Sequence, residues 1–323
     1  MCQRAFGRNV QLDAIQELTG GTFNETYRLT LVNAHSSTVV LRVAPPPDDV
    51  TYWDDIALMR REHHIQPYFA ALASLMPQTL MADFTHQLLN RDYIFQTFLQ
   101  GERWEDVEDE LTQEQSCALW HQCGEIVKQM HTTTGTRFGF PLSGSQFSSC
   151  QFLSWSETVL DRFERITASM IDHQFDPMVF TTIAAIAKAN SAVLDEINTP
   201  CLLHGDLWTF NLLIQRDSDP PQIVGVIDAD RAWWGDPMAD WIIFLLTIRQ
   251  SVPKWQPIIQ AFYEGYGEPE PNERDVQSAQ FRQQIYTAMH IGSSVIWSIR
   301  QGHEGGIERG HRELGEILTE LSK

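Results

Sequence analysis

The feature that most constrains this chain is a pair of short apolar runs, residues 212–214 and 223–227, on either side of a turn-forming segment at 217–221. Short β-rich runs separated by such a turn predict an antiparallel hairpin. The turn lies midway between Asn211 and Asp228 along the chain, so a hairpin folded here brings those two side chains together. The sequence therefore predicts an amide and a carboxylate side by side at the open end of one hairpin.

The residues around this hairpin are of the types that bind a divalent cation and accept a proton. Oxygen ligands from Asn211 and Asp228 suit Mg²⁺, which takes few protein ligands and completes its shell with phosphate and water. Asp206 lies five residues before Asn211, on the loop that leads into the hairpin. A carboxylate in that place can accept a proton from an attacking hydroxyl group. This is the division of labour that phosphoryl transfer requires.

The chain changes character near Gly101. Before this glycine, the pattern predicts a helix at 56–73 that Pro67 interrupts, and strands at 25–32, 37–43 and 92–99. After it, apolar periodicity predicts helices at 113–131, 153–171 and 181–197. We therefore predict an α+β fold with two units, residues 1–100 and residues 101–323.

Two segments, HGDLWTFN at residues 204–211 and IDADRAWWGDP at residues 227–237, resemble the catalytic and metal-binding loops of the aminoglycoside phosphotransferase family. That family also includes choline, homoserine and fructosamine kinases. The resemblance implies a two-lobed, protein-kinase-like fold, with a small antiparallel β-sheet in the N-terminal lobe and a mainly helical C-terminal lobe. It also implies an ATP- and Mg²⁺-dependent kinase, with Asp206 as the catalytic residue and Asn211 and Asp228 as metal ligands.

Three further acids follow the predicted metal loop. In the family's pattern the downstream acid is largely structural, so we interpret Asp236 and Asp240 as loop or helix-capping residues. Asp230 could contact a metal ion or the substrate, but we interpret it as a solvated loop acid.

The same resemblance assigns a nucleotide site to the first hundred residues. The segment 20–27 resembles the family's phosphate-covering hairpin, and its two glycines permit close backbone approach to phosphate oxygens. Arg42 stands where kinases usually carry a lysine that holds the α- and β-phosphates, and Glu62 on the following helix is expected to pair with it. Residues 96–99 resemble the hinge between the lobes. The predicted nucleotide-binding residues are Gly20, Gly21, Thr22, Asn24, Arg42, Glu62, Gln96 and Phe98.

The formal net charge is −19, and residues 101–323 carry 32 acids against 16 Lys and Arg. A nucleic-acid-binding face needs the opposite sign, so no nucleic-acid partner is expected. One hypothesis is that the acids of segment 101–114 steer a cationic substrate, with Trp104 and the pair Trp233–Trp234 as aromatic faces for it. The alternative is that these acids are a solvated surface and the tryptophans belong to the core.

No apolar run reaches the roughly 18 residues that a membrane-spanning helix needs. The N-terminus has no apolar signal-peptide core, and the five cysteines form no CxxC pair. An odd number of scattered cysteines suits a reducing compartment. We therefore expect a cytoplasmic protein, monomer or homodimer, without a membrane partner.

The sequence also bears on three other functions. A P-loop enzyme lacks support because the chain has no GxxxxGK[ST] motif. A protein kinase needs a long activation segment, whereas Asp228 is followed almost at once by Gly235-Asp236-Pro237. A nucleotide-binding pseudokinase or interaction protein without catalysis remains open. The acceptor also remains open: a small hydroxylated compound such as an aminoglycoside, an amino alcohol, a sugar or a glycated amine.

Overall fold

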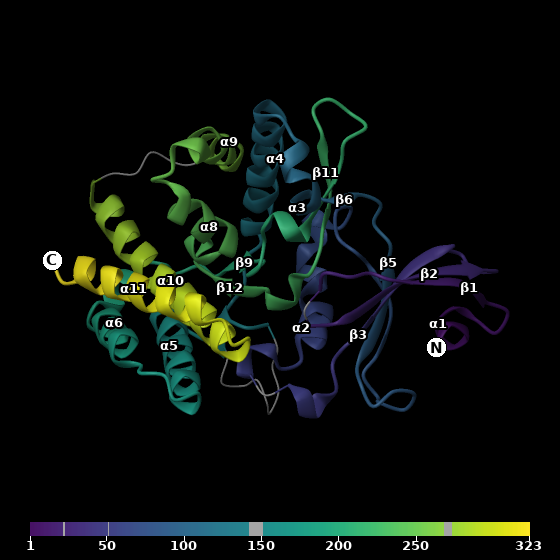
Figure 1. Cartoon of the computed structure of the whole chain (residues 1–323), viewed down its shortest axis with the longest axis horizontal. Coiled ribbons are helices and arrows are strands. Elements are labelled where there is room, and N and C mark those ends of the chain that lie inside the picture. The colour runs from purple at the N-terminus through teal and green to yellow at the C-terminus, as the bar shows by residue number, and fades with distance from the viewer. Residues whose placement is uncertain (22, 51, 142–150, 268–272) are drawn as a thin grey trace. The chain divides into compact units, whose positions relative to one another are not determined.

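The computed structural model describes residues 1–21, 23–50, 52–141, 151–267 and 273–323. Their contacts divide the chain into two compact units (Figure 1). The first unit comprises Met1–Met130, Asp206–Ala232 and Gln260–Tyr266, and the second comprises His131–Gly205, Trp233–Ile259 and Gly267–Lys323. These units differ from the division predicted at residue 100, because the strand after Gly101 joins the sheet of the hairpin in the first unit.

The first unit is built on a five-stranded antiparallel sheet in the order β1-β2-β3-β5-β4. Its strands are β1 (Gln11–Glu17), β2 (Glu25–Val32), β3 (Thr38–Val43), β4 (Thr79–Asp83) and β5 (Tyr93–Thr97). Side chains alternate between the two faces of a strand, so Val39, Leu41 and Val43 of β3 enter the apolar core. Val40 and Arg42, which lie between them in sequence, line a cavity instead.

The three strands predicted in this region are confirmed as β2, β3 and β5 within one or two residues. The helix predicted at 56–73 is α2 (Leu58–Ile65) followed by a 3₁₀ segment, Gln66–Leu72, that carries the proline at its start. The edge strand β1 was not predicted. All seven of its residues are exposed, so it has no buried face that an alternating pattern could reveal.

The predicted hairpin is present in the first unit. It consists of β10 (Leu212–Gln215) and β11 (Gln222–Val226), with β6 (Glu102–Arg103) added along β10. Leu212 lies opposite Val226, and the Ile227 amide donates a hydrogen bond to the Asn211 carbonyl oxygen at 3.0 Å. The two strands of the hairpin therefore remain paired up to Ile227, the residue before Asp228.

One of the remaining helices of the first unit packs through Phe6 against the core of the five-stranded sheet, and the others form an aromatic core. In chain order, these helices are α1 (Cys2–Phe6), α3 (Trp104–Val107) and most of α4 (Gln113–His131), with the C-terminal part of α9 (Gln256–Tyr266). Trp104 is fully buried, with its ring centroid 5.1 Å from that of Trp120, which in turn contacts Phe262. Trp104 is thus a core residue, which agrees with the second of the two interpretations of the tryptophans.

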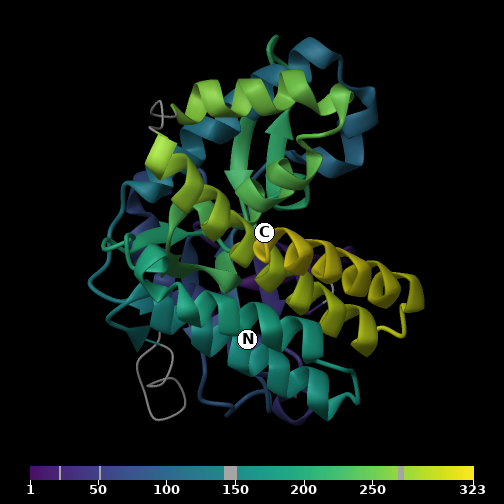
Figure 2. The same cartoon turned by 90° about the vertical axis from the view of Figure 1, so that its left-hand side faces the viewer.

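The second unit combines a small sheet with several helices. Its sheet has the order β8-β7-β12-β9, made from β7 (Phe138–Gly139), β8 (Gln151–Phe152), β9 (Cys201–Leu203) and β12 (Trp233–Gly235). Its helices are α5 (Trp155–Asp172), α6 (Met178–Ala189), α7 (Ser191–Leu194), α8 (Trp241–Arg249), α10 (Glu273–Arg300) and α11 (Glu304–Leu321). Figure 2 shows α10 and α11 side by side. In the part of the chain that the structure describes, no helix is long and apolar enough to cross a membrane.

Candidate active site

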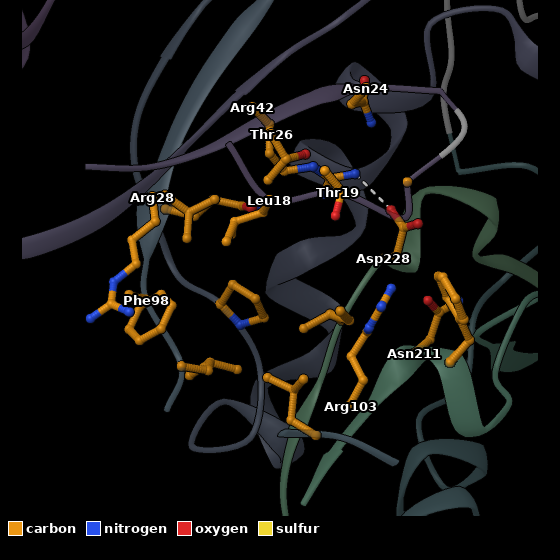
Figure 3. A pocket seen from close by; sticks show the side chains of 18 of the residues that line it. Leu18, Thr19, Asn24, Thr26, Arg28, Arg42, Phe98, Arg103, Asn211 and Asp228 are labelled. Carbon is orange, nitrogen blue, oxygen red and sulfur yellow. Dashed lines mark hydrogen bonds and ion pairs between the residues drawn. The ribbon is translucent and has the colours of Figure 1, made fainter. Parts of the chain in front are cut away.

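A cavity of about 650 Å³ opens in the first unit, and residues from the five-stranded sheet, β6 and the hairpin line it (Figure 3). Among its lining residues are Asp206, Asn211 and Asp228 from the hairpin region and Arg42 from β3. The cavity therefore gathers the predicted catalytic residue and the predicted metal ligands from the hairpin region with the predicted phosphate-binding cation from a distant part of the sequence.

Arg42 is the centre of a buried ion-pair cluster. Its Nη1 lies 2.5 Å from Glu62 Oε2, and its Nη2 lies 2.6 Å from Asp228 Oδ1. Gln96 Nε2 donates to the other Glu62 oxygen at 3.1 Å, so this glutamate is held from two sides. Burial alone would lower the pKa of Arg42, but the charges of Glu62, Asp228 and Asp230 outweigh it and raise the pKa. The guanidinium is therefore a permanent positive charge in the cavity wall.

Asn211 joins the predicted base to the hairpin. Its Nδ2 donates to the Asp206 carbonyl oxygen at 2.7 Å and to Asp206 Oδ2 at 3.2 Å. Because the amide nitrogen is used in this way, the Asn211 Oδ1 is the atom left for a cation. Asp228 has left-handed backbone angles (φ 65°, ψ 50°), which aspartate tolerates better than most residues. Its carboxylate is 40% exposed. These two oxygen donors match the ligand chemistry of Mg²⁺.

The burial of Asp230 contradicts its interpretation as a solvated acid. It is only 5% exposed and lies 3.9 Å from Arg42 Nη2. Burial, reinforced by the nearby Asp228 charge, raises its pKa well above the ordinary aspartate value. Glu62, Asp228 and Asp230 each place one carboxylate oxygen within 4.8 Å of the others. The sequence interpretation failed because burial here depends on β3 and α2, which are remote in sequence.

The predicted phosphate-covering turn lies at the same cavity. Gly20 has φ +108°, a conformation that side chains rarely adopt. Gly21 and Asn24 line the cavity, while Thr22 lies outside the described residues. Phe98, predicted as part of the hinge, also lines it, and the Arg28 guanidinium carbon lies 4.5 Å from the Phe98 ring centroid (Figure 3).

A family model described as the phosphotransferase enzyme family matches residues 14–275. The chain belongs to this family. Search of the curated proteins finds no match.

Solved structures show the same kinase-like fold as this phosphotransferase. The GDP complex of wild-type aminoglycoside 2'-phosphotransferase-IIIa is 15% identical, with a TM-score of 0.64, and the match covers 99% of this chain and 97% of that one. A ternary complex of a thermostable mutant of aminoglycoside phosphotransferase APH(4)-Ia with ADP and hygromycin B is 14% identical, with a TM-score of 0.64 and coverage of 98% and 96%. The gentamicin complex of APH(2")-IIa is 16% identical, with a TM-score of 0.62 and coverage of 97% and 93%.

Two acids of the phosphotransferase that were predicted to be caps have that role. Asp236 accepts a hydrogen bond from the Met238 amide, and Asp240 caps α8 by accepting from the Trp241 amide. Asp240 also accepts from the backbone amides of His204 at 3.2 Å and Gly205 at 2.9 Å. It thereby fixes the backbone directly before the predicted catalytic residue, Asp206.

Buried charges around Asp240 keep it ionised. Its Oδ2 lies 3.1 Å from His131 Nε2. Burial alone would raise the pKa of Asp240, but the hydrogen bond and charge of His131 more than offset this and lower the pKa. An ionised carboxylate is the better acceptor for backbone amides.

A further arginine of the phosphotransferase, Arg231, was not predicted from the sequence. It follows the predicted metal loop, and its guanidinium lies 2.9 Å from Asp55 Oδ1 and 3.5 Å from Asp54 Oδ2. Arg61 of α2 donates to the Asp54 backbone oxygen at 2.8 Å. The predicted metal loop is therefore tied to the same helix that carries Glu62. The only signal in the sequence was that Arg231 lies three residues after Asp228. The acidic partners of Arg231 are too remote in sequence to be inferred.

Proposed function

We propose that this phosphotransferase is an ATP- and Mg²⁺-dependent small-molecule kinase that transfers the γ-phosphoryl group to a hydroxyl group. The observation that carries the proposal is the gathering of Asp206, Asn211, Asp228 and Arg42 at one cavity. Family membership supports phosphoryl transfer. The nucleotides named in the related complexes, GDP and ADP, support the use of a purine nucleotide.

Each residue has one part in the proposed reaction. Asp206 accepts the proton of the acceptor hydroxyl while the hydroxyl oxygen bonds to the γ-phosphorus, and the bond from that phosphorus to the β–γ bridging oxygen breaks. Asn211 and Asp228 would hold Mg²⁺, which supplies charge neutralisation at the phosphates. Arg42 offers positive charge to the phosphates, and Glu62 fixes its position. The Asn211 hydrogen bonds keep Asp206 oriented.

The charge of the acceptor does not follow from segment 101–114. Glu102 and Glu110 both pair with Arg216 at 2.6 Å, and Asp106 pairs with Arg103. Glu105 accepts a hydrogen bond from the Thr209 hydroxyl. Most acids of this segment already have partners on their own chain, so they give little support to a cationic acceptor. We propose a small hydroxylated acceptor and leave its charge to experiment.

The test is a panel assay for ADP release from Mg-ATP over hydroxylated amines, aminoglycosides, amino alcohols and neutral sugars. At least one compound should stimulate release strongly, and EDTA should abolish the stimulation. If a cationic acceptor were steered by the protein's charge, its kcat/KM should fall between about 0.02 and 0.2 M salt, since screening acts over about 10 Å at 0.1 M. A neutral sugar should show little change. Tight nucleotide binding without any turnover would favour the pseudokinase alternative.

A second prediction concerns the anchor of the metal loop. Arg231→Gln removes the ion pairs to Asp54 and Asp55, so the loop that carries Asp228 loses its tie to α2. The Mg²⁺ concentration for half-maximal activity should rise about 10-fold, in the range seen when residues that orient metal ligands are removed. Titration of activity with Mg²⁺ at saturating ATP measures this.

Arg60→Gln is the matched control. Arg60 lies on α2 and pairs with Asp92 at 2.7 Å, but it does not line the cavity. Its loss should lower the unfolding temperature no more than Arg231→Gln does, and it should not change the Mg²⁺ requirement. An equal change of the Mg²⁺ requirement in both variants would mean that Arg231 only stabilises the fold.

A further inference from the structure

Arg103 is fixed to the hairpin by its backbone. It lies in β6, where it pairs with Leu213 of β10, two residues after Asn211. The preceding glycine allows this approach, because a Cβ at Gly101 would lie 2.8 Å from Val224 and 3.1 Å from the Ile214 oxygen. The position of Arg103 is therefore tied to the same strands that position the predicted metal ligands.

The Arg103 side chain lies in the cavity. Its guanidinium carbon is 4.5 Å from the ring centroid of Phe210, which stacks on Trp208 with centroids 5.3 Å apart. Its Nη1 reaches Gly20, where a Cβ would collide with it. Figure 3 shows the side chain extending from β6 toward the region of Thr19 and Asp228. The cation thus spans the cavity from the catalytic segment to the glycine turn.

Asp106, the hydrogen-bond partner of Arg103, leaves part of the guanidinium available for a ligand. Asp106 accepts from Nε at 2.9 Å and from Nη2 at 3.0 Å, while Nη1 is the atom directed at Gly20. The Asp106 side chain is 51% exposed and that of Arg103 is 27% exposed. Such exposed ion pairs contribute little free energy. A guanidinium binds phosphate more strongly, because charge-assisted hydrogen bonds to phosphate are short and directional.

The other arginines that line the cavity are placed differently. Arg42 uses one Nη on Glu62 and the other on Asp228, and Arg231 is engaged by Asp54 and Asp55. Arg28 lies over the Phe98 ring. Among the four described arginines of the lining, Arg103 is the one whose Nη1 faces the glycine turn.

We propose that Arg103 is a second phosphate-binding cation, which contacts the nucleotide phosphates beneath the glycine turn through Nη1. This inference rests on the proposed nucleotide site, and it adds a residue from the segment after the predicted hinge. Arg103 would hold the phosphates on the side of Phe210, whereas Arg42 holds them on the side of β3 and α2. The aromatic stack of Phe210 and Trp208 keeps the guanidinium plane in place.

The test measures dissociation constants for adenosine, ADP and the non-hydrolysable analogue AMP-PNP, in the presence of Mg²⁺, by calorimetry. Arg103→Gln should weaken AMP-PNP binding by about 10–100-fold, the range of a lost charge-assisted hydrogen bond. Adenosine binding should change less than about two-fold, because adenosine carries no phosphate. Arg103→Lys should recover part of the loss, since it keeps the charge without the fork.

Two further variants sharpen the result. Arg165→Gln removes an arginine of α5 that pairs with Asp161 at 2.7 Å, and neither residue lines the cavity, so it should leave the binding of all three ligands unaffected. Asp106→Asn frees Arg103 and should not weaken AMP-PNP binding. An equal loss for adenosine and AMP-PNP in Arg103→Gln, no loss, or tighter binding would each overturn the proposal. If the unmodified protein bound none of the three ligands, the proposed function itself would fail instead.

Discussion

Asp206→Asn should slow phosphoryl transfer by about 10²–10⁴-fold, the usual contribution of a positioned general base. The change keeps the size of the side chain and removes its ability to accept a proton from the acceptor. The shorter hydrogen bond of Asn211, to the Asp206 carbonyl oxygen at 2.7 Å, does not depend on the side chain and should persist. The loop should therefore keep its conformation, and the affinity for Mg-ATP should change little.

Single-turnover rates with an acceptor identified in the panel provide the measurement, with nucleotide affinity measured in parallel. Asp217→Asn is the matched control, because the same chemical change is made at an exposed residue near the tip of the same hairpin. Its rate should stay within about two-fold of the unmodified protein, as expected for surface substitutions. An Asp206→Asn variant with an undiminished rate would remove this residue from the mechanism.

Asp228→Ala should abolish the Mg²⁺-dependent part of nucleotide binding. The Asp228 carboxylate is the more exposed of the two candidate ligands and is expected to bridge Mg²⁺ to the phosphates. Its loss should weaken AMP-PNP binding in Mg²⁺ by at least about 10-fold. Adenosine binding should be retained, because Arg42 keeps its pairing with Glu62 and the cavity wall stays in place.

Calorimetry with and without Mg²⁺ separates the two contributions. Asp228→Asn serves as a second variant that preserves volume, since removal of one partner from a buried ion-pair cluster can destabilise the fold. Asp217→Ala is the control for loss of a hairpin carboxylate, and thermal unfolding checks that each variant is folded. Normal Mg²⁺-dependent affinity in both Asp228 variants would exclude this residue as a ligand.

The hairpin, with Asn211 and Asp228 at its open end, could be predicted because it depends only on neighbouring residues in the sequence. A turn between two short apolar runs sets the register, and the register places Asn211 beside Ile227, one residue before Asp228. The α+β class followed from the strand-rich start of the chain and the helical periodicity after Gly101, and the kinase-like fold from the resemblance to a family. The pairing of Arg42 with Glu62 was also expected, although it rested on the resemblance to a family rather than on spacing.

What could not be predicted depends on contacts between remote segments. Asp230 was assigned to solvent because its neighbours in sequence form a loop, whereas its burial comes from packing against α2. Arg231 and Asp55 are 176 residues apart, so nothing in a single sequence links them. The proposed role of Arg103 depends on how closely its guanidinium approaches Gly20, which only the folded structure reveals.

The strand pairing at the base of the catalytic segment has an energetic consequence for ligand binding. The chain leaves the four-stranded sheet after β9 and returns to it in β12, where Trp233 pairs with Leu203. Residues 206–232 therefore form a segment whose two ends are held together by the pairing of β9 with β12, in the absence of any ligand. Closing a flexible loop costs conformational entropy that grows with its length. Because folding meets this cost, binding energy from the proposed nucleotide would remain available for aligning the reacting groups.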